Sequence, residues 1–230
     1  MKYYRIVTQD YYGERIASYA DFINDVEEKV FKEIGDGQII KNIGVFDNFF
    51  LSSYDKEEFW EWNLFDVHKF YGKPGLMTPN LLISKKLKNI LEDHNIAEPN
   101  HYYKSNLIYK KEKFDYYIFQ FTGNKIFKNT LSYIDFNKSV YLDPVTKENI
   151  YSESLDDFLL DYKRIYKANG IENKLKNKKL VLKDNLDFFP IGTIMKDNLV
   201  SARLKNSIEE NDITGFEFSE LDYEVIIEKK

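Results

Sequence analysis

Three histidines, His68, His94 and His101, have the widest chemical repertoire of any residues in this chain. Neutral imidazole is a common metal ligand, and histidine also acts as a general acid or base near neutral pH. His94 and His101 are seven positions apart with two acidic residues directly before the first, and a metal site would need these groups to converge. A related segment later in the chain has Asn211 where His94 stands. We therefore expect surface or capping histidines and no bound metal.

A second group with catalytic potential is formed by Glu112, Lys113 and Asp115. Carboxylate and lysine sets serve nucleases, but this spacing differs from the usual Glu-x-Lys strand pattern, and a charged hairpin tip explains the group better. The sequence has neither a glycine-rich phosphate loop nor a GxSxG nucleophile turn. It also has no cysteine, which excludes disulfides, thiolate nucleophiles and cysteine zinc sites. A Ser/His/Asp triad is not excluded by residue order, but nothing nominates one. We expect no cofactor.

The segment from Asp55 to Asp66 reads DKEEFWEWNLFD and holds both tryptophans of the chain among five acidic residues. One interpretation is a strand whose tryptophans lie in the core. The other is an acidic patch that binds a basic partner protein, because protein interfaces combine aromatic anchors with charged rims. The residues predicted to contact that partner are Glu57, Glu58, Trp60, Glu61, Trp62 and Asp66.

The longest pattern in the chain is a repeat. Residues 80–96 read NLLISKKLKNILEDHNI, and residues 197–213 read DNLVSARLKNSIEENDI. At a spacing of 117 they share seven identities in seventeen positions. Unrelated segments of this length share about one identity, so the similarity indicates a repeated structural unit. Neither copy contains a reactive constellation, which favours a structural role for the repeat.

Each copy of the repeat predicts a short capped helix. Ser84 and Ser201 are placed as N-cap residues, whose hydroxyl accepts a hydrogen bond from a backbone N–H. Apolar residues follow at helical spacing, so we expect equivalent helices at 85–95 and 202–212 with their leucines in the core. Acidic residues near the end of each helix oppose the helix dipole, and the sequence offers no reason for them.

The remaining segments do not alternate as βαβ units, which favours an α+β fold with a mostly antiparallel sheet and several short helices. Two further helices are predicted where apolar residues at helical spacing end at Gly35 and at Gly170. Aromatic and β-branched stretches predict strands. The predicted strands are 3–12, 39–51, 59–65, 102–109, 114–122, 133–136, 139–142, 180–182, 188–189 and 225–227. We expect one domain over residues 1–230, with a division into pseudo-repeated subdomains 1–125 and 126–230 left open.

Composition and charge narrow the class of protein. Hydrophobic residues make up 43% and charged residues 31%, which supports a packed core and argues against disorder. The net charge of −5 arises from 33 basic and 38 acidic residues, a mixed surface without a nucleic-acid footprint. No apolar run is long enough to span a bilayer, and the segment after Met1 lacks the apolar region of a secretory signal. We expect a cytoplasmic protein without nucleic-acid or membrane partners.

Several short motifs in the second half of the chain form one pattern. They are Tyr133–Ser139 (YIDFNKS), Leu182-Lys183 with Ile191, Leu199–Asn206 (LVSARLKN), Ile208-Glu209 and Ile213–Phe218 (ITGFEF). This pattern resembles the eleventh immunity-protein family of bacterial polymorphic toxin systems, formerly described as a domain of unknown function. The resemblance covers roughly residues 80–220, and the first 75 residues match no family motif.

The resemblance implies a cytoplasmic immunity protein that binds a cognate toxin and blocks it without catalysis, and it carries over no catalytic residue. An acidic antidote of this kind suits a basic nuclease toxin, because complementary charge accelerates association. The residues alone leave two other classes open. An enzyme of nuclease or hydrolase type predicts a cleft where Asp, Glu or His side chains converge. A structural scaffold predicts homo-oligomers, and the sequence leaves the oligomeric state open.

Overall fold

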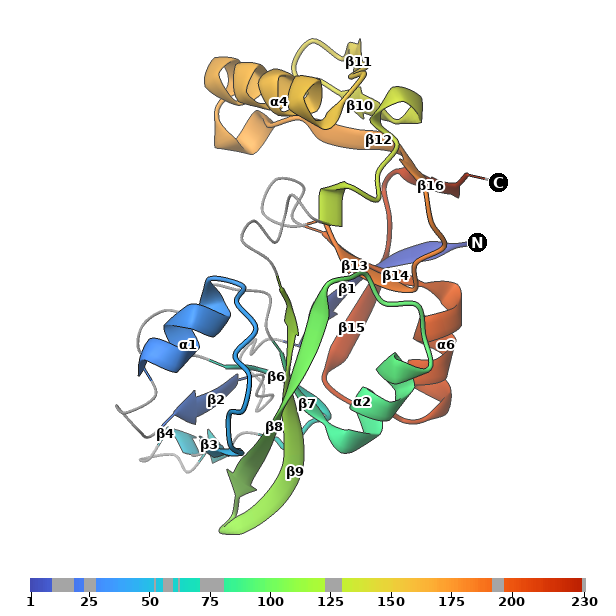
Figure 1. Ribbon diagram of the computed structural model, residues 1–230. Coiled ribbons are helices and arrows are strands. Elements are labelled where there is room, and N and C mark those ends of the chain that lie inside the picture. Colours follow the sequence, from blue (N-terminus) through green and yellow to red (C-terminus); the bar gives the residue numbers. More distant parts are fainter. Residues whose placement is uncertain are drawn as a thin grey trace.

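Figure 1 shows the fold of the chain as a computed structural model. The structure describes residues 1–9, 19–22, 28–51, 53–55, 60–61, 63–70, 81–122, 130–191 and 197–228. The fold is α+β with mostly antiparallel sheets, which confirms the fold class predicted from the sequence. The helices are α1 (Glu28–Gly35), α2 (Lys85–Glu92), α4 (Leu155–Asn169) and α6 (Ala202–Glu210), with short 3-10 helices η2 (Phe136–Lys138) and η3 (Ile171–Asn173).

Over these described ranges, the strands form one closed sheet and three open ones. The closed sheet runs β2 (Tyr19–Phe22), β3 (Phe46–Leu51), β8 (Asn100–Tyr109), β9 (Glu112–Phe121), β7 (Leu81–Ser84) and β6 (Val67–Phe70). The second sheet runs β13 (Phe188–Pro190), β14 (Asn198–Ser201), β1 (Tyr3–Thr8) and β15 (Phe216–Glu220). The third runs β11 (Asn149–Ile150), β10 (Val140–Leu142), β12 (Lys176–Leu182) and β16 (Glu224–Ile227), and β4 (Ser53–Asp55) pairs with β5 (Trp60–Glu61).

The repeat seen in the sequence is also a repeat in the fold. The strand order β6-β7-β9-β8 in the closed sheet matches the order β13-β14-β1-β15 in the second sheet, with α2 and α6 following β7 and β14. The register agrees as well, because Ile83 pairs with Val67 while Val200, 117 positions later, pairs with Phe188. We call β6, β7, α2, β8 and β9 the first unit, and β13, β14, α6, β15 and β1 the second unit.

The two units differ in where their fourth strand comes from. In the first unit β9 follows β8 through the two-residue turn Lys110-Lys111, which confirms the predicted hairpin. In the second unit the corresponding strand is β1, at the N-terminus, which pairs with both β14 and β15. The division into subdomains 1–125 and 126–230 stays a prediction, and β1 is the strand that crosses it.

Each repeated helix begins at a serine that is held by an aspartate. The hydroxyl of Ser84 accepts the Leu87 N–H and donates to the Asp66 carboxylate at 2.6 Å. The hydroxyl of Ser201 accepts the Leu204 N–H and donates to Asp187 at 2.6 Å. The backbone N–H of each serine also donates to the carbonyl of the same aspartate. Both predicted N-caps are therefore confirmed, each within a hydrogen-bonded pair of residues.

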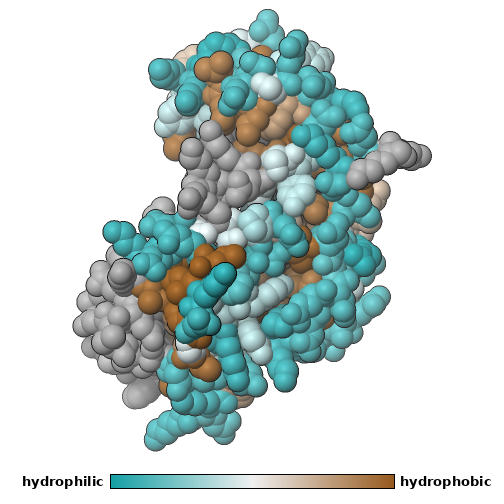
Figure 2. Space-filling view, viewed as in Figure 1, coloured by the Kyte–Doolittle hydropathy of each residue, from teal (hydrophilic) through white to brown (hydrophobic). Residues whose placement is uncertain are grey.

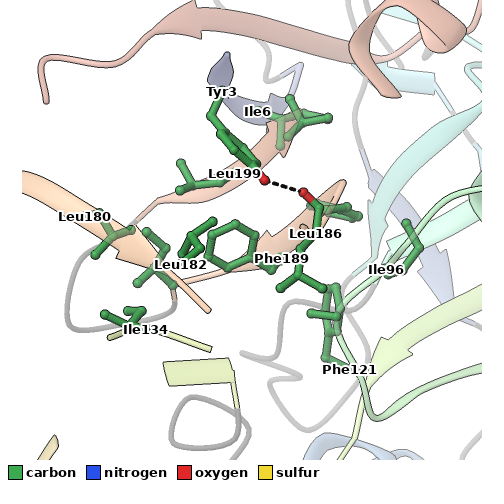
Figure 3. Close-up of a cluster of buried hydrophobic side chains, with 14 of the residues drawn as sticks. Tyr3, Ile6, Ile96, Phe121, Ile134, Leu180, Leu182, Leu186, Phe189 and Leu199 are labelled. Atoms are coloured by element: carbon green, nitrogen blue, oxygen red, sulfur yellow. Dashed lines mark hydrogen bonds between the residues drawn. The ribbon is translucent and has the colours of Figure 1, made fainter. Parts of the chain in front are cut away.

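A tyrosine in the neighbouring strand donates a hydrogen bond beside each of these caps. Tyr3, opposite Ser201, donates its hydroxyl proton to the carbonyl of Leu186 at 2.7 Å (Figure 3). Tyr116, opposite Ser84, donates in the same way to the carbonyl of Phe65. In each unit the accepting residue directly precedes the aspartate of the cap. The arrangement of serine, aspartate, tyrosine and accepting carbonyl thus occurs twice.

The repeated lysines explain the first of the two acidic residues at each helix end. Lys205 contacts Glu209 at 2.5 Å, and its ammonium lies 5.3 Å from the ring centroids of Tyr4 and Phe218. Lys88 has the same arrangement, since it contacts Glu92 and lies over the rings of Tyr102 and Tyr117. An i,i+4 ion pair and cation–π contacts offset the unfavourable helix dipole. The identities shared by the two copies therefore maintain the fold.

Hydrogen bonds to the two cap aspartates also join the units to each other. The carboxylate of Asp66 in the first unit accepts hydrogen bonds from the N–H and hydroxyl of Thr214 at 3.0 Å each. The carboxylate of Asp187 in the second unit accepts one from the N–H of Asn95 at 2.9 Å. Gly215, with φ of +96°, passes so close to the first unit that a Cβ there would lie 2.6 Å from the Val67 carbonyl oxygen. Helices α2 and α6 lie side by side at this junction (Figure 1).

The third sheet and α4 form the upper part of the molecule in Figure 1. Helix α4 is capped by Ser154, whose hydroxyl accepts the Asp157 N–H, and it ends at Gly170 with φ of +76°. Its buried face places Phe158 against Tyr141, with ring centroids 4.6 Å apart. These residues join the large hydrophobic cluster that continues through β12 into the second unit (Figure 3). Helix α4 therefore confirms the prediction made from its sequence pattern.

Three strand predictions need correction. The strand expected over 39–51 begins only at Phe46, because Asn42 has φ of +59° and turns the chain out of an extended conformation. Within the expected strand 59–65, the structure describes only Trp60–Glu61 as a strand, and residues 63–65 do not pair with another strand. The expected strand 133–136 is absent, and η2 occupies Phe136–Lys138 before β10.

Candidate protein-binding site

The acidic and aromatic segment predicted to bind a partner is described only in part. Glu57, Glu58 and Trp62 lie outside the described residues. Trp60 and Glu61 form β5, which pairs antiparallel with β4. The structure thus assigns a strand to the centre of this segment, and the predicted binding role of these residues stays a prediction.

Asp66, the last residue of that predicted set, forms hydrogen bonds that stabilise the fold. Its carboxylate accepts hydrogen bonds from Ser84 and Thr214, as described above. Its backbone N–H donates to the hydroxyl of Thr214 at 3.1 Å. The carboxylate therefore holds the first helix cap and the junction of the units, and no observation yet tests contact with a partner.

The three histidines do not form a common site. His94 sits at the end of α2, where its ring contacts the carbonyl of Ile90 at 2.7 Å and the hydroxyl of Ser207 at 3.1 Å. This is a capping role of the predicted kind. His101 is partly buried and packs edge-on against Tyr103, with ring centroids 4.5 Å apart, and burial lowers its pKa. In the described part of the chain, no three His, Cys, Asp or Glu side chains are arranged to hold a metal ion.

His68 is fully buried between the rings of Phe65 and Tyr116. Its Nε2 accepts the N–H of Phe65 at 3.0 Å, and its Nδ1 has no hydrogen-bond partner among the described residues. Burial lowers its pKa to about 4. The second unit carries Phe189 at the corresponding position, opposite Leu199. The imidazole is therefore a neutral core group in a place that accepts an aromatic ring.

We predict that His68 makes the protein less stable in mild acid. Below pH 6.5 this histidine is protonated in the unfolded chain, whereas buried His68 in the folded chain stays neutral until about pH 4. The free energy of unfolding therefore falls as pH falls through this range. The loss is about 3 kcal/mol, since one pKa unit corresponds to about 1.4 kcal/mol. Urea denaturation of wild type and His68→Gln between pH 7 and 4 measures it. An equal slope in both proteins would contradict the prediction.

An open groove lies between the segment 39–45 and the start of β8. Its volume is about 510 Å³, and its walls are Ile39–Val45 on one side and His101–Lys104 on the other. Ile39 and Val45, which both line this groove, are 47% and 44% exposed. Figure 2 shows hydrophobic surface gathered on this face, where the chain after α1 crosses beside β8.

The wall formed by the 39–45 segment is held in place by polar contacts beneath it. The hydroxyl of Tyr103 accepts the N–H of Ile40 at 3.1 Å and donates to the carbonyl of Gln38 at 3.2 Å. The buried side chain of Gln120 donates to the carbonyl of Ile34 at 2.9 Å. These bonds fix the segment that presents the exposed side chains. The groove is thus formed before any ligand arrives, which reduces the entropic cost of binding.

The groove is not predicted by the sequence pattern, because residues 39–51 have the pattern of one continuous strand. Paired strands would have turned alternate side chains into the core. The signal available in the sequence was the pair Asn42 and Gly44 within an apolar stretch, since both residues tolerate conformations that end a strand.

Outside the groove, two further groups of charged side chains form ion pairs. Lys113, on the predicted hairpin tip, contacts Asp47 at 2.5 Å. A smaller pocket of about 170 Å³ beside β1 is lined by Arg5 with its partners Asp197 and Asp222. Tyr223 donates to the same Asp197 carboxylate at 2.8 Å. These charges neutralise one another within the pocket wall, which is the arrangement of a structural ion-pair cluster.

No helix in the described ranges has the length and apolar character needed to cross a membrane. No protein-family model matches the sequence, and no curated protein matches it either. The function therefore has to be argued from the groove and from the residues that carry the resemblance.

Proposed function

We propose that this protein is a non-catalytic binding protein, an immunity protein that binds and neutralises a cognate bacterial toxin in the cytoplasm. The observation that carries the proposal is the preformed groove with exposed Ile39 and Val45 on one wall. Exposed apolar patches on a protein surface mark sites that bind another protein, a membrane or a ligand. A partner that covers them gains the hydrophobic free energy of their burial.

The residues that carry the family resemblance have structural roles. Ser201 and Leu204 form a helix cap, Lys205 and Glu209 form the ion pair over the rings, and Thr214 joins the units. Each of them maintains the fold. A family that shares such residues shares a framework, and function then depends on the surfaces that this framework presents.

The proposal expects a toxin gene beside this one, and it is tested by titrating the toxin domain encoded there with the purified protein. A binding antidote abolishes toxin activity in a linear titration that ends at a fixed molar ratio, because each toxin molecule is occluded by bound protein. An enzyme that inactivated the toxin would act at much smaller ratios and with time. Full toxin activity in a large excess of this protein would refute the proposal.

A further inference from the structure

One edge of strand β8 pairs with a neighbouring strand along only half of its length. Along its other edge β9 pairs with every residue of Asn100–Tyr109. On the groove side, β3 pairs only with the part from Ser105 to Tyr109. Within the described residues, no backbone hydrogen bond joins the 39–45 segment to residues 100–104. Among the described residues, the wall of the groove that β8 forms is therefore an unpaired strand edge, which is a template for another strand.

The hairpin register identifies the backbone groups on that edge. Lys110 and Lys111 both have positive φ, 50° and 69°, as in a two-residue type I′ turn. In such a hairpin Tyr109 and Glu112 exchange both backbone hydrogen bonds, and every second residue of β8 does the same with β9. Tyr102 lies between these positions, so its N–H and C=O point into the groove. The N–H of Lys104 points the same way.

The two faces of the edge differ in chemistry. Side chains alternate along a strand, so Tyr103 lies on one face while Lys104 lies on the other. The Tyr103 face is continued by the apolar wall that presents Ile39 and Val45. Lys104 is exposed and supplies a positive charge to the opposite face. The described residues that line the groove include Lys41 and Lys104 and no acidic residue, so the charge of this lining is opposite in sign to the chain's net charge of −5.

We propose that the groove binds an extended segment of the partner protein that alternates apolar and acidic side chains and adds to β8 as a strand. Its backbone pairs with Tyr102 and Lys104, its apolar side chains pack on the wall at Ile39 and Val45, and its carboxylates face Lys104. Main-chain pairing supplies affinity and the alternating side chains supply specificity in this mode of recognition. The inference rests on the proposed function, because the partner in question is the toxin.

Amide hydrogen exchange tests the pairing directly. The probe is the toxin domain encoded beside this gene, added to the full chain, with exchange read at individual amides. The amides of Tyr102 and Lys104 are expected to exchange at least about tenfold more slowly in the complex. A complex that leaves both amides unchanged overturns strand addition while the proposed function stands. Failure to form any complex overturns both.

Matched substitutions test the wall and the charge. Ile39→Asp should weaken the complex by about tenfold or more, whereas Ile171→Asp, at a similarly exposed isoleucine far along the chain, should not. Lys104→Glu should weaken it in a salt-dependent manner. Urea denaturation of each variant shows whether the free protein still folds. Equal affinity of the two isoleucine variants for the toxin domain would overturn the assignment of this groove.

A second copy of the chain is the competing occupant of an open strand edge. If it bound there, the amides of Tyr102 and Lys104 in the free protein would become more protected as protein concentration rises, and light scattering would show a dimer. That result would overturn the proposal. Concentration-independent exchange in the free protein, with protection only on adding the toxin domain, supports it.

Discussion

Leu204→Ala is expected to lower the free energy of unfolding by about 2–5 kcal/mol, and Leu87→Ala by a similar amount. Both side chains are fully buried and stand at the same position of their repeated helices. Each substitution removes three carbon atoms from a packed site and leaves a cavity that the rigid surroundings only partly fill. The equality of the two effects is the feature that follows from the repeat.

Chemical denaturation midpoints of the two variants measure this effect. The matched control is Leu160→Ala, because Leu160 lies on α4 with 65% of its surface exposed. This control should change the free energy of unfolding by no more than about 0.5 kcal/mol. If Leu87→Ala or Leu204→Ala behaved like the control, the helix would not be packed in the core as the structure shows.

Asp187→Ala is expected to cost about 2–4 kcal/mol, because it removes the acceptor of several hydrogen bonds at once and leaves the buried Ser201 hydroxyl without its partner. The Asp187 side chain is only 2% exposed. It accepts hydrogen bonds from the Ser201 hydroxyl at 2.6 Å, from Arg203 and from the N–H of Asn95 at 2.9 Å. One carboxylate thus holds a helix cap, an ion pair and the contact to the other unit. Its loss should loosen all three together.

The control for Asp187 is Asp222→Ala, which breaks the pair between Arg5 and a carboxylate that is 78% exposed. Exposed pairs contribute about 0.2–1 kcal/mol, so the two substitutions should differ severalfold in urea denaturation. Similar losses of stability in both variants would mean that Asp187 is no more than a surface charge.

Asp187 should also contribute to acid sensitivity at low pH. Burial alone would raise the pKa of Asp187, but hydrogen bonds from Arg203, Ser201 and Asn95 outweigh it and lower the pKa. The folded chain then stays ionised at a pH where the unfolded chain is already protonated, so stability falls as pH falls below the ordinary aspartate range. This window lies below that of His68, which separates the two contributions.

The sequence was sufficient for the elements whose causes are local. The serine caps and the leucine stripes of α2 and α6 follow from spacing within one helix, and the β8–β9 hairpin follows from two strand patterns around a short turn. Pairings between distant segments left no such trace. Nothing in the N-terminal residues indicates that β1 takes the place in the second unit that β9 takes in the first.

The aspartates that hold the caps could not be predicted from the repeat either, because the loops that follow them differ in length. Asp66 precedes Ser84 by 18 residues, whereas Asp187 precedes Ser201 by 14. The repeat therefore falls out of register before it reaches them. The groove was missed for another reason, since a positive φ at Asn42 is a single-residue choice that ends an otherwise strand-like pattern.

The measurement that tests the central claim most directly is growth of cells that express the toxin encoded beside this gene, with and without this protein. Wild type should restore growth, and Val145→Asp, at an exposed valine outside the groove, should restore it equally. Val45→Asp, on the groove wall, should accumulate as folded protein and fail to protect. Cells that die despite abundant folded wild-type protein would contradict the account.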